Sequence, residues 1–332
     1  MSESFIESSW AQKDPPFDTP LRPKTLSSFI GQEALTTRLS IFIEAAKQRK
    51  EPLGHCLFHG PPGLGKTTLS NILAEEMGSH MVSSSGPALE KPANLAGILT
   101  NLEEGDIFFV DEIHRLNRTV EEYLYSAMED FSLDIMIDSG PSSRSVQVKI
   151  KPFTLVGATT RSGLVSGPMR SRFAITCRLE FYPPDTLAQI LERTSSILDV
   201  TLSPDAALEL AKRSRGTPRI ANHLFRWVRD FAQIHKHSQI TMDTVHQALD
   251  MLAIDHLGLD EMDKKLLTTI IDHHDGGPVG LNTLAIALSE DATTLSEVYE
   301  PYLILKGLLR HTARGREATQ LAYDHLSKEK SS

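Results

Sequence analysis

Cysteine is nearly absent from this sequence, which has only Cys56 and Cys177 in 332 residues. Each lies within a short apolar run that is typical of a buried strand. We therefore expect two buried, reduced thiols, and this scarcity disfavours both a disulfide scaffold and a cysteine metal site.

Long apolar runs are also lacking, and the N-terminus does not show the basic-then-apolar order of a signal peptide. With 40% hydrophobic and 23% charged residues, the composition is that of a folded globular chain. The sequence therefore predicts a cytoplasmic protein with no membrane partner. Its length favours two or three domains rather than one core.

Positive charge is in deficit, because 34 Lys and Arg residues stand against 43 Asp and Glu residues, for a net charge of -9. This balance excludes a protein coated in positive charge but leaves room for a basic patch on an acidic body. Any contact with DNA must therefore be local.

One stretch that is present carries most of the functional signal. Residues 60–67 fit the phosphate-loop pattern G-x-x-x-x-G-K-[ST] at every fixed position. Glycines such as Gly63 and Gly65 let successive N–H groups turn inward around phosphates. Lys66 would place a positive charge on the outer phosphates, and the hydroxyl of Thr67 can hold Mg²⁺. We expect a site for ATP and Mg²⁺.

The segments around this loop support a nucleotide site. Residues 55–59 form a short apolar run typical of a strand, and residues 68–77 have helical spacing that stops at Gly78. A further helix is expected over residues 33–49. A glycine-rich turn that matches by chance is the alternative, but the strand, loop and helix occur in the required order.

A second segment, residues 106–112, is continuously apolar from 107 to 110 and ends in two acids, Asp111 and Glu112. A continuous apolar run is expected for a parallel strand buried on both faces, and its carboxyl end lies at the same edge as the phosphate loop. Asp111 would hold Mg²⁺, and Glu112 would polarise the attacking water. The alternative is that the two acids only cap the next helix, expected over residues 113–128.

Two further segments carry weaker signals. Residues 153–161 are expected to form another buried strand that ends in small hydroxyl residues. The Thr159 hydroxyl could sense the γ-phosphate, although a strand-end threonine is often only a helix cap. A turn at residues 169–173 contains Arg170 and Arg172. Arginine suits charge that develops on a transferred phosphoryl group, although surface arginines are usually only solvated.

An insertion follows the second strand of the nucleotide fold. Alternating runs at residues 133–137 and 146–150 flank a glycine-proline turn and predict a β-hairpin. The hairpin lies outside the minimal nucleotide fold. The residues leave open whether it is a surface ornament or a partner-docking arm.

A helical region follows the α/β pattern and predicts a small second domain. The expected helices are residues 187–198, 204–214, 219–236 and 242–252. Arg219 begins the third of them, where a positive charge opposes the helix dipole unless an anion faces it. A bound phosphate would resolve that mismatch.

The last part of the chain has three helical runs and a hairpin with a glycine tip, which together indicate a winged helix. Positive charge gathers at Lys306, Arg310, Arg314 and Arg316. Such a wing suits a DNA phosphate backbone. A protein-docking module is the alternative. The predicted limits are an arm at 1–19, an ATPase domain at 20–182, a helical domain at 183–254 and a winged helix at 255–332.

Eight motifs together carry a resemblance to a known family. They are residues 21–23, 60–68, 100–103, 111–116, 127–130, 157–161, 216–222 and 276–281. In this order they resemble the RuvB family, the ATP-driven motors of Holliday junction branch migration in bacteria. The resemblance covers nearly the whole chain. It implies an α/β P-loop NTPase (AAA+) domain, a small all-α lid domain and a C-terminal winged-helix domain.

The resemblance also implies roles for individual residues in a hexameric ring with its ATP sites between subunits. Arg172 would be an arginine finger that reaches into a neighbour's site, Thr159 sensor 1 and Arg219 sensor 2, beside the catalytic Lys66 and Glu112. The nucleotide would lie against Leu21, Arg22, Gly63, Gly65, Lys66, Thr67, Thr68, Glu129, Asp130, Phe131, Tyr182 and Arg219.

The same resemblance implies the partners. The hairpin at 133–150 would dock on RuvA, and Arg310, Arg314 and Arg316 would contact duplex and four-way junction DNA. A junction resolvase is a further expected partner. Some positions depart from the family pattern. His311 stands where an arginine is usual, and Ser171 and Ala174, on either side of Arg172 and Phe173, replace the usual aspartate and glycine.

Two alternative functions share parts of this pattern. A non-motor AAA+ protein, such as a clamp loader or an ATP-gated DNA-binding switch, would have the same nucleotide site. A winged-helix regulator would need no hydrolysis, which the intact Lys66, Asp111 and Glu112 disfavour.

Overall fold

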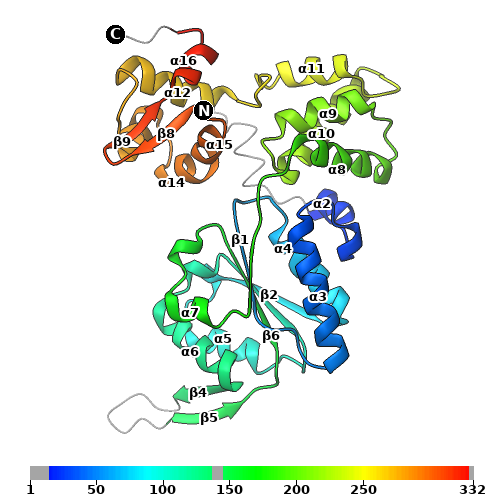
Figure 1. Cartoon of the computed structure of the whole chain (residues 1–332), viewed down its shortest axis with the longest axis vertical. Helices are drawn as coiled ribbons and strands as arrows, with labels where there is room; N and C mark the ends of the chain where they lie inside the picture. Colours follow the sequence, from blue (N-terminus) through cyan, green and yellow to red (C-terminus); the bar gives the residue numbers. More distant parts are fainter. Residues whose placement is uncertain (1–14, 137–144, 329–332) are drawn as a thin grey trace. The chain divides into compact units, whose positions relative to one another are not determined.

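A computed structural model describes residues 15–136 and 145–328 of the chain. The chain divides into two compact units, one made of Leu21–Phe181 and the other of Tyr182 onward together with the start of the chain (Figure 1). Each unit has its own fold. Within the described residues, no helix is long and apolar enough to cross a membrane.

The apolar runs of the first unit form a five-stranded parallel sheet in the order β2-β3-β6-β1-β7. The strands are β1 Cys56–His59, β2 Met81–Ser85, β3 Ile107–Asp111, β6 Thr154–Thr159 and β7 Ile175–Arg178. Every residue of β6 is buried. Burial on both faces explains why these strands are continuous apolar runs instead of alternating ones.

Helices cover both faces of this sheet, with α3 and α4 on one side and α5, α6 and α7 on the other (Figure 1). Their bounds are α3 Glu33–Arg49, α4 Lys66–Met77, α5 Pro92–Leu99, α6 Arg118–Asp130 and α7 Gly167–Ser171, with short 3-10 turns at η1 Leu26–Ser28, η2 Gly86–Ala88, η3 Ile113–Arg115 and η4 Ser162–Leu164. Phe108 and Leu155 of the sheet pack with Leu95 and Leu124 of α5 and α6 in one core cluster. The predicted helix over residues 33–49 is confirmed.

The helix predicted over residues 113–128 is wrong at its start. The segment begins as the 3-10 turn η3, and α6 starts only at Arg118. The cause is Asn117, whose side-chain oxygen accepts the N–H of Val120 at 3.0 Å and caps the new helix. This break separates Glu112 and His114 from the regular helix that follows.

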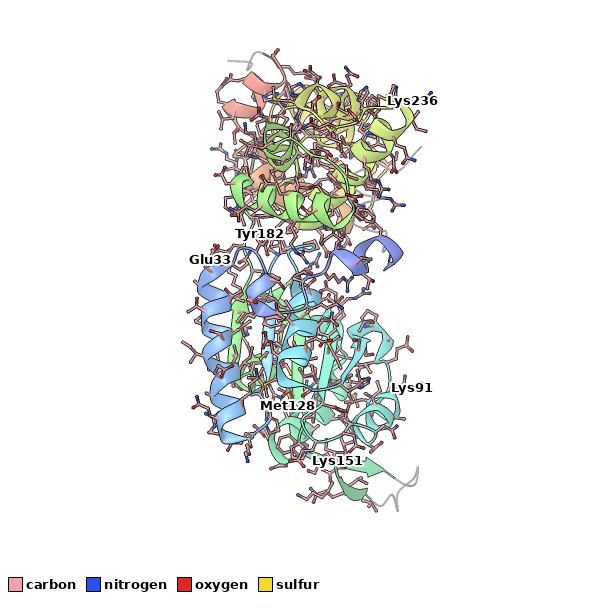
Figure 2. The ribbon with its side chains drawn as sticks, turned by 90° about the vertical axis from the view of Figure 1, so that its right-hand side faces the viewer. Glu33, Lys91, Met128, Lys151, Tyr182 and Lys236 are labelled. Carbon is pink, nitrogen blue, oxygen red and sulfur yellow. The ribbon has the colours of Figure 1, made fainter. Side chains whose placement is uncertain are left out.

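The predicted hairpin forms a separate two-stranded antiparallel sheet, in which β4 Ser132–Met136 pairs with β5 Ser145–Lys149. Its predicted turn at residues 139–142 lies outside the described residues. Figure 2 shows Met128, near the end of α6, toward the same end of this unit as Lys151, which follows the hairpin.

Both cysteines lie in the sheet, Cys56 in β1 and Cys177 in β7. They are free thiols with 0% exposure, so the prediction of buried, reduced cysteines is confirmed. Burial raises the pKa of both thiols. They therefore act as small apolar core residues.

The second unit begins with a bundle of four helices, as predicted, with bounds that differ by a few residues. These are α8 Pro184–Ile197, α9 Pro204–Arg213, α10 Pro218–Ile234 and α11 Met242–Asp250. Proline stands at the first helical position of α8, α9 and α10, where its missing N–H costs no hydrogen bond.

The start of the chain also belongs to this unit, and part of the predicted flexible arm is ordered. Pro15–Leu21 form helix α2, whereas residues 1–14 lie outside the described residues. Phe17 is 9% exposed, and the guanidinium of Arg226 on α10 lies 5.0 Å from its ring centroid. This cation–π contact explains the order of a segment that has no periodicity of its own.

The end of the chain forms the predicted winged helix. Its elements are α12 Glu261–His273, α13 Leu281–Leu288, α14 Ala292–Thr294, the π-helical turn η5 Leu295–Tyr299, α15 Glu300–Leu305, β8 Leu309–Thr312, β9 Gly315–Ala318 and α16 Gln320–His325. The third predicted helix, residues 294–305, is thus interrupted by a π-helical turn. Val279 joins the wing by two backbone hydrogen bonds with Arg316, of 2.8 and 2.9 Å.

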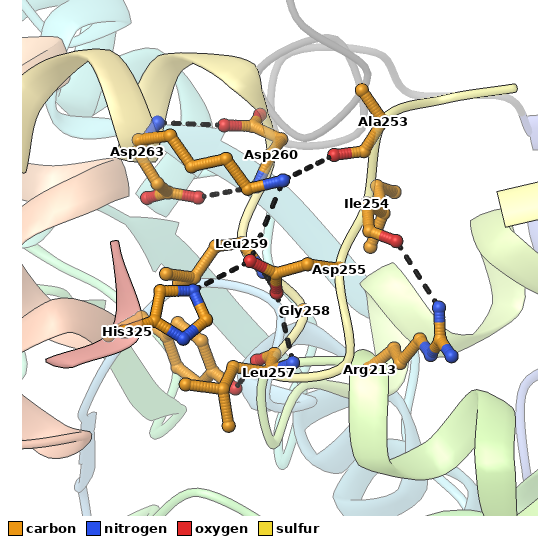
Figure 3. Close-up of polar contacts among 12 residues, drawn as sticks. Arg213, Ala253, Ile254, Asp255, Leu257, Gly258, Leu259, Asp260, Asp263 and His325 are labelled. Atoms are coloured by element: carbon orange, nitrogen blue, oxygen red, sulfur yellow. Dashed lines mark hydrogen bonds and ion pairs between the residues drawn. The ribbon is translucent and has the colours of Figure 1, made fainter. Parts of the chain in front are cut away.

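The segment between α11 and α12 is held by a dense set of polar contacts (Figure 3). Asp255 accepts the N–H groups of Leu257 and Leu259 at 2.9 and 3.0 Å, and its other oxygen lies 2.8 Å from His325 Nε2. Burial raises the pKa of Asp255, but the Leu259 N–H and the His325 contact outweigh burial, so the pKa is lowered. The connection between bundle and winged helix is therefore fixed on both sides.

A buried arginine crosses the same junction. Arg215, after α9, is 2% exposed and forms an ion pair with Asp263 of α12, which is 0% exposed. Its Nε donates to the carbonyl of Gly258 at 3.0 Å, and its guanidinium lies over the Tyr302 ring at 4.9 Å. Asp263 also caps α12 with Asp260. We call Arg215, Asp260, Asp263 and Tyr302 the junction cluster.

Candidate ATP site and DNA-facing wing

The phosphate loop follows β1 and has the backbone that its sequence predicts. Gly60, Gly63 and Gly65 have φ angles of 143°, 74° and 105°, which favour glycine. A Cβ on Gly60 would lie 2.4 Å from the carbonyl oxygen of Leu179. The loop therefore needs glycine for both its turn and its close approach to β7.

Lys66 begins α4 and is only 7% exposed. Its Nζ donates to the carbonyls of Gly60 and Pro61 at 2.8 and 2.9 Å, so the amine sits within the loop itself. Burial lowers the pKa of His59, and the positive charges of Arg178 and Lys66 lower it further. The loop is thus a cationic cradle at a helix N-terminus, which suits a polyphosphate.

The sheet order brings the predicted acids to the loop. Strand β6 lies between β3, which ends in Asp111, and β1, and the N–H of Gly60 donates to the carbonyl of Thr159 at 3.2 Å. One oxygen of Asp111 accepts the N–H of Glu112 at 3.0 Å. Asp111 and Thr67, in the first turn of α4, supply a carboxylate and a hydroxyl, which are the hard oxygen ligands that Mg²⁺ takes.

Glu112 stands in the left-handed region, with φ of 47°. Its Oε2 accepts the N–H of Thr160 at 3.2 Å and the Thr160 hydroxyl at 3.1 Å. The Nδ1 of His114 lies 3.1 Å from the same oxygen. The carboxylate is therefore held through one oxygen. The sequence interpretation missed Thr160 and His114 as members of this site; the signal for Thr160 was a second hydroxyl at the same strand end.

Thr159, the predicted sensor, is fully buried. Its hydroxyl accepts the N–H of Arg161 at 3.0 Å and lies 2.9 Å from His114 Nδ1. Thr160, beside it, is only partly buried and contacts Glu112 directly. Thr159 therefore reaches the carboxylate through the histidine ring.

Arg172 lies near the amino ends of the sheet strands, whereas the phosphate loop follows the carboxyl end of β1. Strand β7 begins at Ile175, three residues after Arg172, and Ile175 pairs with Cys56 at the amino end of β1. The phosphate loop follows the carboxyl end of β1, whose four residues span roughly 13 Å. Arg172 is therefore placed away from the phosphates of its own chain.

The surroundings of Arg172 are specific. Its guanidinium lies 4.4 Å from the Tyr125 ring centroid, its Nη2 is 3.0 Å from Glu129 Oε2, and its Nη1 donates to the carbonyl of Pro168 at 2.8 Å. The end of α6 lies near the same amino ends of the strands, because the carbonyl of Met128 lies 3.1 Å from Nε2 of His55, the residue before β1. This end of the helix includes Glu129, Asp130 and the C-cap Phe131. The structure thus groups these three predicted nucleotide contacts with Arg172, not with the phosphate loop.

The remaining predicted nucleotide contacts lie on both units. Phe29, in the segment that follows Leu21 and Arg22, would lie 3.3 Å from a Cβ on Gly65, so this segment passes the phosphate loop. In the second unit, Tyr182 is 5% exposed, and its N–H donates to the carbonyl of Gly216 at 2.9 Å. Arg219 is the second residue of α10, in the same region as Tyr182.

The basic wing is less uniformly exposed than its sequence suggests. Arg316 donates from Nε and Nη2 to the carboxylate of Glu300 at 2.8 and 3.2 Å, and Glu300 is 1% exposed. His311 Nε2 lies 2.9 Å from the same carboxylate. Arg310 pairs with Glu317 at 2.6 Å. Arg314 at the tip is exposed and has no ion pair among residues 15–136 and 145–328.

Three family models together match nearly the whole chain. Residues 21–179 match the Holliday junction DNA helicase RuvB P-loop domain, residues 182–255 the RuvB AAA lid domain, and residues 256–327 the RuvB C-terminal winged helix domain. The chain thus has the predicted P-loop, lid and winged-helix architecture. The P-loop match ends at residue 179 and the lid match begins at residue 182, close to the limit between the two compact units at Tyr182.

Curated relatives and solved structures agree with these models. The chain is 61% identical over 326 residues to the Holliday junction branch migration complex subunit RuvB of Protochlamydia amoebophila, with 98% of each chain covered. It is 59% identical to the same subunit of Chlamydia pneumoniae, covering 95% of this chain and 94% of that one. The Thermotoga maritima RuvB Holliday junction branch migration motor aligns with a TM-score of 0.86 at 53% identity, over 93% of this chain and 99% of that one. The chain belongs to the RuvB family.

Proposed function

We propose that the chain is an ATP-driven motor that moves the branch point of Holliday junctions in DNA recombination and repair, in the cytoplasm. This proposal depends mainly on one observation. The phosphate loop, Asp111 and Glu112 lie together at the carboxyl ends of neighbouring parallel strands, in a chain that also has a winged helix. Residues suited to hydrolysis favour a motor over a DNA-binding regulator, which needs no hydrolysis.

The residues of the site divide the work of hydrolysis. Glycine N–H groups and Lys66 bind the phosphates, and Thr67 and Asp111 would hold Mg²⁺, which neutralises charge that develops on the phosphates. Glu112 is held through Oε2 by Thr160, so its Oε1 is left to accept a proton from water. Arg219 and Tyr182 would contribute from the lid.

The site needs a second subunit. Because Arg172 lies at the opposite sheet edge from its own phosphate loop, it can stabilise the transition state only in a neighbour's site. Glu129, Asp130 and Phe131 would meet the neighbour's nucleotide from the same edge. A closed hexameric ring meets this need, because a head-to-tail interface that closes gives every subunit one neighbour on each side.

The partners follow from the other surfaces. Arg314 would contact DNA phosphates directly, whereas Arg310 and Arg316 would do so from positions held by Glu317 and Glu300. The β4–β5 hairpin would dock on RuvA, and a resolvase would act on the same junctions. The finding that His311 contacts Glu300 favours a role inside the wing over a direct DNA contact.

A four-way DNA junction tests this function. With ATP, Mg²⁺ and RuvA, the wild-type protein is expected to separate the junction into two duplexes, measured by gel mobility of labelled strands. Arg314→Ala should weaken junction binding and separation while basal ATP hydrolysis is retained. Hydrolysis without any junction separation would favour the non-motor AAA+ alternative, and DNA binding without hydrolysis would favour the regulator.

Mixed rings test the role of Arg172. Arg172→Ala subunits and Lys66→Ala subunits are each expected to be nearly inactive, but in an equal mixture they should recover up to about a quarter of wild-type ATP hydrolysis. The reason is that some interfaces of a mixed ring join the intact phosphate loop of an Arg172→Ala subunit to the intact Arg172 of a Lys66→Ala neighbour. Arg170→Ala is the matched control, because Arg170 lies in α7, two residues before Arg172, and donates to the Val165 carbonyl. No recovery in the mixture of the two variants would contradict a finger that acts in trans.

A further inference from the structure

We propose that His114 is a positioning residue that couples the Thr159 hydroxyl to the Glu112 carboxylate. This inference rests on the proposed role of Glu112 as the base in ATP hydrolysis. His114 lies in η3, directly after the acids, and its side chain is only 8% exposed. The phosphate-loop and acid motifs assign no role to this buried imidazole, although it lies beside the proposed base.

One ring nitrogen makes both contacts. The Nδ1 atom of His114 lies 3.1 Å from Glu112 Oε2 and 2.9 Å from Thr159 Oγ1. A carboxylate only accepts hydrogen bonds, so Nδ1 must carry a hydrogen to hold Glu112. In the other tautomer Nδ1 accepts the hydroxyl proton of Thr159 and meets the carboxylate with a lone pair.

The backbone sets the orientation of the hydroxyl. Because the N–H of Arg161 already donates to Thr159 Oγ1, that oxygen keeps its own proton for a second partner. When this proton points to His114, the imidazole cannot donate to Glu112; when it points elsewhere, the imidazole can. The orientation of the Thr159 hydroxyl therefore determines whether His114 can donate a hydrogen bond to Glu112.

The carboxylate needs this third contact for its orientation. Thr160 already binds Oε2 through its N–H and hydroxyl, both from the β6 side. His114 approaches the same oxygen from η3, so the two groups fix the carboxylate plane and leave Oε1 for water. Mutation of groups that orient metal ligands typically costs about 10- to 100-fold in activity, and we expect a loss of this order for a group that orients the base.

Three substitutions at His114 test the role of Nδ1. His114→Ala is expected to lower kcat for ATP about 10- to 100-fold with little change in KM, because the imidazole orients the base and does not bind nucleotide. Asparagine carries an amide close to the position of Nδ1, whereas glutamine carries it further out. His114→Asn should therefore recover most of the activity and His114→Gln little of it. Equal losses in all three variants would indicate only a packing role.

A double-mutant cycle tests the coupling. Thr159→Val removes the hydroxyl that competes with Glu112 for Nδ1, so it is expected to change kcat in the wild-type background and to have no further effect in His114→Ala. Thermal unfolding and nucleotide binding are measured for each variant to exclude misfolding. Additive losses would overturn the coupling. Full hydrolysis in Glu112→Gln would contradict the proposed role of Glu112 as the base. Full hydrolysis in His114→Ala, with loss of hydrolysis in Glu112→Gln, would contradict only the proposed role of His114.

Discussion

Glu112→Gln is expected to bind ATP with near wild-type affinity but hydrolyse it at least about 100-fold more slowly. The amide is isosteric with the carboxylate, so the contacts from Thr160 can persist in part, but it cannot accept a proton from the attacking water. The phosphate loop and Lys66 are untouched, and the nucleotide is therefore retained. Single-turnover phosphate release and nucleotide retention on a spin column measure the two effects separately.

The control for this substitution is Glu104→Gln, which removes an exposed carboxylate from the same unit. It is expected to leave both binding and hydrolysis unchanged. Normal turnover in Glu112→Gln would contradict the role of Glu112. Loss of ATP binding in the same variant would instead assign the carboxylate to nucleotide or metal binding.

Arg215→Met is expected to reduce the free energy of unfolding of the second unit by about 3–5 kcal/mol, the typical loss when one partner of a buried ion pair is removed. The substitution leaves Asp263, which is 0% exposed, and Asp260, which is 2% exposed, without their cation. It also removes the donor to the Gly258 carbonyl. Removal of Arg215 is therefore expected to cost more stability than removal of one partner of an exposed ion pair.

Urea denaturation of the full chain measures this loss. Trp227 of α10, whose Nε1 donates to the Ala248 carbonyl at 2.7 Å, gives a fluorescence signal from the helical bundle. Lys212→Ala is the matched control, because Lys212 is an exposed cation on neighbouring α9. We expect the control to stay within about 0.5 kcal/mol of wild type. A similarly small change for Arg215→Met would show that the buried pair has no net structural role.

The sequence predicted what local patterns determine. Phosphate-loop spacing, buried strand runs and helical periodicity depend on neighbours within a few residues, so the β1 to α4 unit and the predicted α3 are as expected. Asn117 shows the limit, because one capping side chain ended a run whose apolar spacing continues. The Thr160 contact with Glu112 spans 48 residues, and no local pattern signals it.

Charge was the property least predictable from sequence. Arg316 is one of four cations grouped near the wing, but its guanidinium is held by buried Glu300, sixteen residues earlier in the chain. Arg215 has no motif of its own, and its partner Asp263 lies beyond two further helices. Periodicity identifies which apolar side chains turn inward, whereas a paired, buried charge can be found only when both partners are placed in space.

The junction cluster has a mechanical consequence for the second unit. Arg219 on α10 and Arg314 at the wing tip lie in one compact unit, and the segment that joins their domains is held by Arg215 and by Asp255, which Figure 3 shows. Because these side chains hold this segment from both domains, a rotation of the lid would be passed on to the winged helix and not absorbed in the segment between them.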